Sequence, residues 1–206
     1  PAEAPEPPPE QRRAALRRSQ TIRFCTASDG ARIAYSTVGH GAPLVKTANW
    51  LNHLEFDWES PVWRHWMEEL SRERMLVRYD ERGNGLSDWN AEDISFDAFV
   101  RDFESVVEAL ALKRFALLGI SQGGAVSIAY AVKYPERVSH LIIYGAFAKG
   151  WALGRSDEEV ARQRAMMTLS EQGWGQANPA FRQLFSSLFV PGATREEMDW
   201  VNELQR

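Results

Sequence analysis

Apolar and polar positions follow two different periods along the chain. Short apolar runs, typical of β-strands, occupy residues 21–27, 31–37, 43–49, 75–80, 115–120 and 141–144. Stretches with helical spacing lie between the later runs: one begins with Ser60 as N-cap and Pro61 in the first helical position, a second is capped by Ser95, and a third covers 124–132. Because strands alternate with helices, the pattern predicts an α/β fold with a mainly parallel sheet and helices on both faces.

The two ends of the chain differ from this middle part. Residues 1–19 are rich in proline and arginine, and we expect them to form a disordered linker. Residues 20–150 form the predicted core, in which Ser-Asp-Gly at 28–30 makes the first two strands an antiparallel hairpin. Residues 151–206 lack the strand pattern and are rich in Met, Phe and Trp, which predicts a helical cap. Its helices are expected at 156–173, 178–189 and 194–206.

Composition and charge narrow the range of functions. The net charge of −4 argues against nucleic-acid binding by this chain. No apolar run reaches the roughly 18 residues that a membrane span requires, and the first residues lack the layout of a secretory signal, so we expect a cytoplasmic protein without membrane contact. The single cysteine, Cys25, lies in an apolar stretch and is expected to be a buried structural thiol.

Residues 119–124, Gly-Ile-Ser-Gln-Gly-Gly, carry the main chemical signal. They follow an apolar strand directly and open a helix, which is the setting of a nucleophile elbow. A serine on such a sharp turn has a strained backbone and needs small neighbours. We therefore expect Ser121 to be a nucleophile, with the backbone N–H of Gln122 as an oxyanion donor at the start of the helix. This chemistry requires no cofactor, and no cluster of side chains has metal-ligand spacing.

Two further motifs occur in order with this elbow. Residues 80–87, Asp-Glu-Arg-Gly-Asn-Gly-Leu-Ser, close the fourth strand, and residues 134–138, Tyr-Pro-Glu-Arg-Val, precede the last one. Over residues 21–150 the chain thus resembles the α/β-hydrolase family, whose members often show D-x-R-G-x-G-x-S after this strand. The resemblance implies a serine hydrolase with a helical cap that acts on a small, apolar ester or related acyl compound.

The resemblance also implies a second oxyanion donor just after the third strand. Family members commonly have His-Gly there, whereas this chain has Ala48-Asn49-Trp50. The donor is then expected to be the backbone N–H of Trp50, since a backbone donor needs no particular side chain. The alternative is that Trp50 forms only a wall of the pocket.

The histidine and the acid of a catalytic triad are not evident. The family order places the acid and then the histidine after the serine. Only His140 follows Ser121, at the start of a strand, where it should face away from the site; His53 is a weak alternative base. We therefore expect the last strands, with the acid and the histidine, to lie beyond Arg206 and these 206 residues alone to be nearly inactive.

A second function remains open. Hydrolase-like domains resembling this one are sometimes fused to DNA-binding or nucleotide-cyclase domains in bacterial regulators, where the pocket acts as a ligand sensor. The proline-rich start of the chain and the departure at Ala48 and Asn49 fit that alternative. The intact elbow at Ser121 favours the enzyme, because a binding pocket gains nothing from a strained serine.

Overall fold

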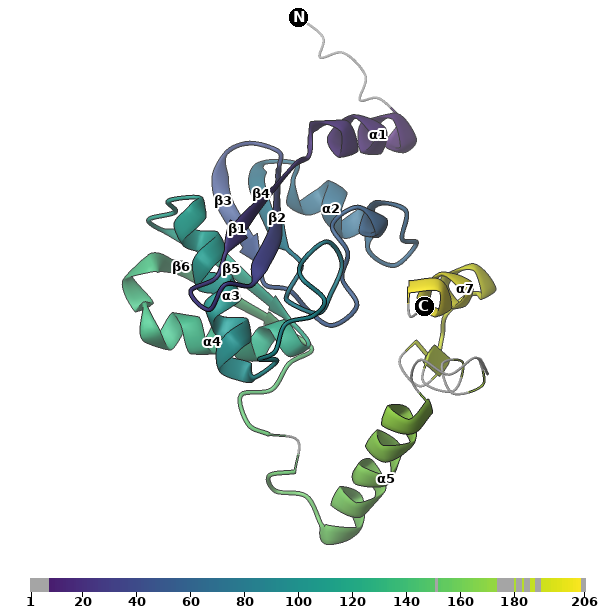
Figure 1. Ribbon diagram of the computed structural model, residues 1–206. Coiled ribbons are helices and arrows are strands. Elements are labelled where there is room, and N and C mark those ends of the chain that lie inside the picture. Colours follow the sequence, from purple (N-terminus) through teal and green to yellow (C-terminus); the bar gives the residue numbers. More distant parts are fainter. Residues whose placement is uncertain are drawn as a thin grey trace, which may run out of the picture. The chain divides into compact units, whose positions relative to one another are not determined.

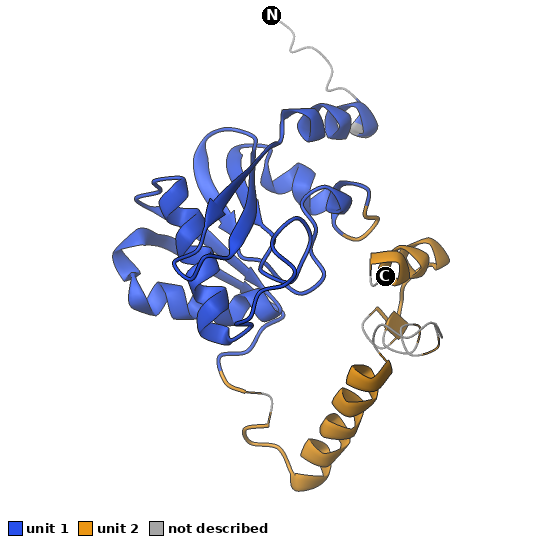
Figure 2. Cartoon of the chain, viewed as in Figure 1, with its two compact units in different colours: residues 1–59, 63–148 blue, residues 60–62, 149–206 orange. Residues whose placement is uncertain are grey.

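The computed structural model describes residues 8–150, 152–173, 180, 183, 186–187 and 190–204. The chain divides into two compact units (Figure 2): residues 1–59 with 63–148, and residues 60–62 with 149–206. The first unit contains the sheet and all the motifs named above.

The first unit is built on a six-stranded sheet (Figure 1). Its strands are β1 (Thr21–Thr26), β2 (Arg32–Val38), β3 (Ala42–Lys46), β4 (Arg74–Tyr79), β5 (Phe115–Ile120) and β6 (Val138–Tyr144), in the spatial order β1-β2-β4-β3-β5-β6. β2 pairs antiparallel with β1 and β4, and the remaining pairs are parallel. The expected α/β architecture with a mainly parallel sheet is confirmed.

Side chains alternate between two cores on the opposite faces of the sheet, as the period of a strand requires. Val45, Val77 and Leu117 point into one core, which also contains side chains of α3 (Phe96–Ala109) and α4 (Gln122–Lys133). The residues next to them in sequence, Leu44, Leu76 and Leu118, point into the other core, with Met67 of α2 (Arg64–Leu70). Helices therefore cover both faces of the sheet.

Several local signals act as the sequence predicts. Ser95 caps α3, since its Oγ accepts the N–H of Ala98 at 3.2 Å. Gly30 has a φ of 96° in the turn between β1 and β2, and Tyr134 ends α4 before the short 3₁₀ turn η2 (Pro135–Arg137). Cys25 is half buried against the first core, and this burial raises the pKa of its thiol to about 11, as expected for a structural thiol.

The prediction of a disordered linker is wrong for residues 9–19, which form helix α1 (Pro9–Ser19). Pro9 fits the first turn of a helix, where its missing N–H is no loss. Arg12 and Arg13 bind the same buried carboxylate of Glu68, at 3.4 and 2.7 Å. The arginines that suggested a solvated segment thus attach α1 to α2, through contacts between residues that are 56 and 55 positions apart.

The predicted cap at Ser60 is also wrong. Helix α2 begins only at Arg64, its N-cap residue is Trp63, and no side chain caps it. The Oγ of Ser60 instead accepts the N–H of Val62 at 3.1 Å. A bond to the second residue onward is the geometry of a serine turn, which competes with helix formation. The 3₁₀ turn η1 (Phe56–Trp58) precedes this segment.

The described part of the second unit includes the helices α5 (Asp157–Gly173) and α7 (Arg195–Leu204). They confirm the first and third of the helices expected after Gly150; the one expected at 178–189 lies largely outside the described residues. The Oδ1 of Asn202 accepts the hydroxyl of Ser186 at 2.9 Å. No helix among the described residues is long and apolar enough to cross a membrane. The role of this unit as a cap stays a prediction.

Candidate active site

Ser121 occupies a sharp turn between β5 and α4. Its backbone has φ 52° and ψ −125°, and it is one of three non-glycine residues with positive φ in the described chain. Such angles are strained for an L-residue and are retained where the surrounding structure imposes them. The side chain of Ser121 is exposed, and α4 begins at the next residue. The first N–H groups of α4 have no partner within the helix.

The glycines on either side of Ser121 are required by close approaches. A Cβ on Gly119 would lie 2.5 Å from the Oγ of Ser127 and 2.7 Å from the Cα of Gly124. A Cβ on Gly123 would collide with the carbonyl oxygen of Ala48. Gly123 therefore lets the start of α4 touch the loop after β3.

That loop, residues 47–52, is held by buried polar side chains. The Oγ of Thr47 lies 2.9 Å from the carbonyl oxygen of Gly123 and 3.0 Å from the Oγ of Ser127. Asn52 accepts the N–H of Asn49 at 3.3 Å and donates to Asp80 Oδ1 at 2.6 Å. Each of these buried polar atoms thus finds a partner, which fixes the loop between the ends of β4 and β5.

The side chain of Gln122 links this loop to the motif after β4. Its Oε1 accepts the backbone N–H of Trp50 at 3.1 Å. Its Nε2 donates to both carboxylate oxygens of Glu81, each at 3.2 Å. Glu81 is buried, and burial raises the pKa of its carboxyl to about 7. Three separate segments of the chain therefore meet at the residue that directly follows Ser121.

The lysine at the end of β3 is also buried here. Lys46 donates to Asn49 Oδ1 at 2.5 Å and lies 5.6 Å from the centre of the Trp63 ring. Its burial lowers the pKa of its ammonium group to about 8. Asp80, next to Glu81, has a pKa raised to about 7, again mainly by burial. Three titratable groups with strongly shifted pKa values therefore lie at the ends of β3 and β4, which is common at functional sites.

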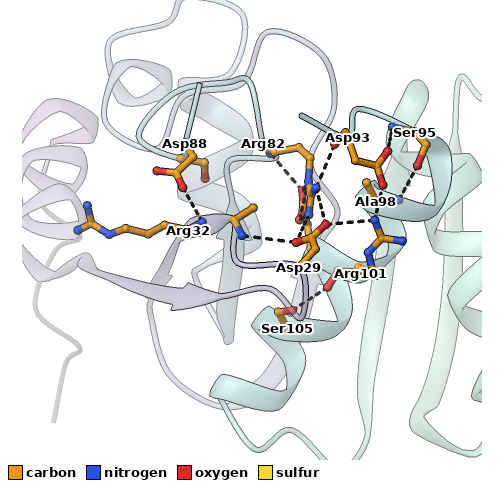
Figure 3. Close-up of polar contacts among 12 residues, drawn as sticks. Asp29, Arg32, Arg82, Asp88, Asp93, Ser95, Ala98, Arg101 and Ser105 are labelled. Carbon is orange, nitrogen blue, oxygen red and sulfur yellow. Dashed lines mark hydrogen bonds and ion pairs between the residues drawn. The ribbon is translucent and has the colours of Figure 1, made fainter. Parts of the chain in front are cut away.

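The rest of the motif at 80–87 is structural. The guanidinium of Arg82 binds Asp102 of α3 at 2.7 Å. It also binds Asp29 of the hairpin turn at 2.7 Å (Figure 3). Arg101 binds the same Asp29 at 3.1 Å (Figure 3). Ser87 donates to the carbonyl oxygen of Asp80 at 2.5 Å. These contacts tie the loop after β4 to α3 and to the β1–β2 turn.

A hollow of about 290 Å³ opens beside Arg82, but none of Ser121, Gln122 or Trp50 lines it. Its walls come from the β1–β2 turn and from residues 88–93, and the charged side chains among them are mostly acidic. All the guanidinium nitrogens of Arg82 are already bonded within the protein. This hollow therefore belongs to the structural network and not to the chemistry at Ser121.

Comparison with known proteins now assigns the family. A family model described as the alpha/beta hydrolase fold matches residues 40–189, well over half of the chain. The chain belongs to the alpha/beta hydrolase fold family. A 2-hydroxy-6-oxo-2,4-heptadienoate hydrolase of Pseudomonas putida is 35% identical over 163 residues, which cover 69% of this chain and 58% of that protein. The AB hydrolase superfamily protein YisY of Bacillus subtilis is 27% identical over 176 residues, or 76% of this chain and 63% of that protein.

Solved hydrolase structures show the same fold. An esterase from Exiguobacterium antarcticum superposes with a TM-score of 0.69 at 24% identity, covering 90% of this chain and 68% of that one. An esterase from a Rhodococcus species gives a TM-score of 0.66 at 22% identity, covering 89% and 68%. The chain spans about three-fifths of the length of the first curated hydrolases that it matches.

The two histidines considered as bases, His53 and His140, have other contacts or positions in the described structure. His53 Nδ1 accepts the N–H groups of Glu55 and Phe56, both at 3.2 Å, so it caps the turn η1. His140 is exposed on β6, where its register partner is Ala116 near the start of β5, opposite the end that carries Ser121. Among the described residues, no hydrogen bond joins a histidine to Ser121.

The predicted site residues are therefore brought together only in part. Ser121 and Gln122 are adjacent at the strand-to-helix turn, and Trp50 reaches them through the amide of Gln122. Sequence reasoning missed Glu81, which binds that amide. One signal was available: an acidic residue directly after a buried strand, in the loop that faces the elbow.

Proposed function

We propose that this protein is a serine hydrolase that cleaves a small, apolar ester or related acyl compound through an acyl-enzyme on Ser121. The observation that carries the proposal is the backbone of Ser121, strained at φ 52° between β5 and α4 and exposed at the end of the sheet. Backbone strain of this kind clusters at functional sites. Membership of the alpha/beta hydrolase fold family supports the reaction class.

In the proposed mechanism, the Oγ of Ser121 attacks the carbonyl carbon of the substrate and its proton passes to a histidine base. The negative charge that develops on the carbonyl oxygen is stabilised by the backbone N–H of Gln122 and by that of Trp50. As the intermediate collapses, the protonated base gives its proton to the leaving oxygen, so the alcohol departs and the acyl group stays on Ser121. Water, activated by the same base, then hydrolyses the acyl-enzyme.

We further propose that the base and its orienting acid come from residues beyond Arg206. Two observations support this. The only histidine after Ser121 in the 206 residues is His140, exposed on β6, and His53 already accepts two backbone N–H groups through Nδ1. The matched hydrolase of Pseudomonas putida is also longer than the segment that the chain covers.

The substrate class is supported by two features. The matched Pseudomonas hydrolase is named for a small keto-dienoate, a compound with a carbonyl group next to a short carbon chain. The second unit, predicted to be the cap, contributes apolar side chains such as Met166, Met198 and Trp200. A small carbonyl compound fits the first feature, and the apolar body of the proposed substrate rests on the second alone.

A ligand-sensing domain is the second candidate. It is favoured by the Ala48-Asn49-Trp50 sequence in place of His-Gly and by the Gln122 side chain that already occupies the N–H of Trp50. A sensor of this kind would bind its ligand without turnover.

Hydrolysis of p-nitrophenyl acetate, butyrate and octanoate by the full-length protein tests the two candidates. An enzyme should release p-nitrophenol with a preference among the esters, and Ser121→Ala should lower kcat by at least about 10³-fold while the fold is retained. Saturable binding of the esters without release, equal in the wild type and in Ser121→Ala, would instead support the sensor.

A further inference from the structure

The amide of Gln122 lies between two groups whose hydrogen-bonding character is fixed. On one side is the backbone N–H of Trp50, which can only donate; on the other is the carboxylate of Glu81, which when ionised can only accept. The amide therefore has one allowed orientation, with its oxygen on Trp50 and its NH₂ on Glu81. Reversing the amide would set donor against donor and acceptor against acceptor.

The oxygen of this amide occupies the acceptor position in front of the Trp50 N–H, which the proposed oxyanion role assigns to the carbonyl oxygen of the substrate. The loop that carries Trp50 cannot easily move away, because Ala48 lies against Gly123 and Asn52 binds Asp80. Gln122 is also the residue directly after Ser121, so the Oε1 on Trp50 belongs to the elbow itself. Access to this N–H requires the side chain of Gln122 to leave it.

We propose that Glu81 is a positioning residue that holds the side-chain oxygen of Gln122 on the N–H of Trp50 as a stand-in for the carbonyl oxygen of the substrate, which displaces it on binding. The inference rests on the proposed oxyanion role of that N–H. Exchange of one carbonyl oxygen for another keeps the N–H paired at every stage, which avoids the cost of an unsatisfied donor. It also selects ligands that present a strong carbonyl acceptor.

The ionisation state of Glu81 determines whether the side-chain amide of Gln122 is held in this single orientation. Its carboxyl is 3% exposed, and its pKa is raised to about 7, first by burial and also by Asp102 of α3. Gln122 and Asn84, which donate to it, and Lys46 of β3 oppose that rise. Once protonated, the carboxyl can donate as well as accept, so the single orientation of the Gln122 amide is lost.

Backbone amide NMR of the 206-residue chain tests the arrangement without reference to catalysis. The N–H resonance of Trp50 should move upfield in Gln122→Ala, and in the wild type it should titrate with a midpoint near pH 7. In Glu81→Gln this titration should shrink to the part contributed by Asp80, whose pKa is also about 7 and which binds Asn52 of the same loop. Glu92→Gln, a neutralised carboxyl on an exposed loop, serves as the matched control and should leave the Trp50 resonance and its titration unchanged. A Trp50 resonance that does not respond to Gln122→Ala or to Glu81→Gln would overturn the inference.

The rate at which a fluorophosphonate labels Ser121 in the full-length protein tests the displacement step. Labelling should be several-fold faster in Gln122→Ala than in the wild type, because no side chain has to be displaced, and intermediate in Glu81→Gln. Slower or equal labelling in Gln122→Ala would overturn displacement. No labelling in any variant, with the Trp50 resonance responding as expected, would instead contradict the proposed nucleophile and leave the Glu81–Gln122 contact standing.

Discussion

The backbone N–H of Ser121 donates to the carbonyl oxygen of Tyr144 at 3.0 Å. Tyr144 is the last residue of β6, and the bond continues the parallel pairing of β5 and β6 one residue beyond the end of β5. The sheet therefore fixes the backbone of Ser121 on its N-terminal side, and α4 begins on its C-terminal side. Its positive φ is imposed by two rigid elements, which keeps the hydroxyl at the exposed end of the sheet.

This strain predicts that Ser121→Gly stabilises the protein. Glycine adopts positive φ without penalty, whereas alanine retains the strain, so Ser121→Ala is the matched control. We expect the free energy of unfolding of Ser121→Gly to exceed that of Ser121→Ala by about 1–3 kcal/mol. Urea denaturation followed by circular dichroism measures the difference. Equal stabilities would mean that the turn is relaxed and that the argument for a functional serine loses its main support.

Some of this architecture could be predicted from local sequence and some could not. Apolar runs located all six strands, and the glycines around Ser121 located the elbow, because both signals lie within a few neighbouring residues. The pairing of β2 with β4, which is not the next strand along the chain, leaves no local trace. The hydrogen bond between Gln122 and Glu81, which are 41 residues apart, likewise leaves no signal in the local sequence.

The predictions from sequence failed mainly at charged residues. Proline and arginine in residues 9–19 suggested disorder, because the carboxylate that neutralises Arg12 and Arg13 lies on α2, far along the chain. Arg82 was recognised as part of a family motif, but its two partners, Asp29 and Asp102, are 53 and 20 residues away. Periodicity describes the faces of single elements and cannot identify such partners.

The network at Arg82 predicts a large loss of stability in Arg82→Ala. Asp102 is fully buried, and removing its cation leaves a buried carboxylate without that partner, which costs about 3–5 kcal/mol. Arg101→Ala is the matched control, since Arg101 also binds Asp29 but is partly exposed, and it should cost less than about 1 kcal/mol. The double variant Arg82→Met with Asp102→Leu should recover much of the loss. Similar urea midpoints for the two single variants would contradict this account.

The buried carboxyls of Asp80 and Glu81 predict a stability that falls as the pH rises. Their folded pKa values, about 7, lie above the usual values of 3.8 and 4.5, so the folded state retains protons that the unfolded state has already released. The penalty is absent below about pH 4 and complete above about pH 7. Lys46, with its pKa near 8, stays mainly charged through this window and contributes little to the change.

Glu81→Gln should therefore flatten the pH dependence, because one of the buried carboxyls with a raised pKa is removed. The expected difference is at most about 3 kcal/mol between about pH 4.5 and about pH 7.5. Urea midpoints of the wild type and the variant at these two pH values provide the measurement. Parallel curves would show that Glu81 is ionised in the folded state already at low pH.

The edge strand β6 predicts self-association of the first unit. Within the described residues of that unit β6 pairs only with β5, and its residues Leu141, Ile142, Ile143 and Tyr144 are 37–59% exposed. An apolar strand with a free edge is a template for pairing with another chain. Ile142→Lys should lower the association of the 206-residue chain in sedimentation velocity runs at several concentrations, whereas Val132→Lys on α4, at a position even more open to solvent, should not. A wild-type chain that stays monomeric at every concentration would show that β6 is covered.

The most direct test of the central claim is labelling of the full-length protein with a fluorophosphonate, followed by identification of the modified residue by mass spectrometry. The account predicts a single adduct on Ser121 that is absent from Ser121→Ala, with weak or no labelling of the 206-residue chain alone. A folded full-length protein in which Ser121 stays unmodified would contradict it, because a serine without a base to activate it does not react, and the ligand-sensing function would take its place.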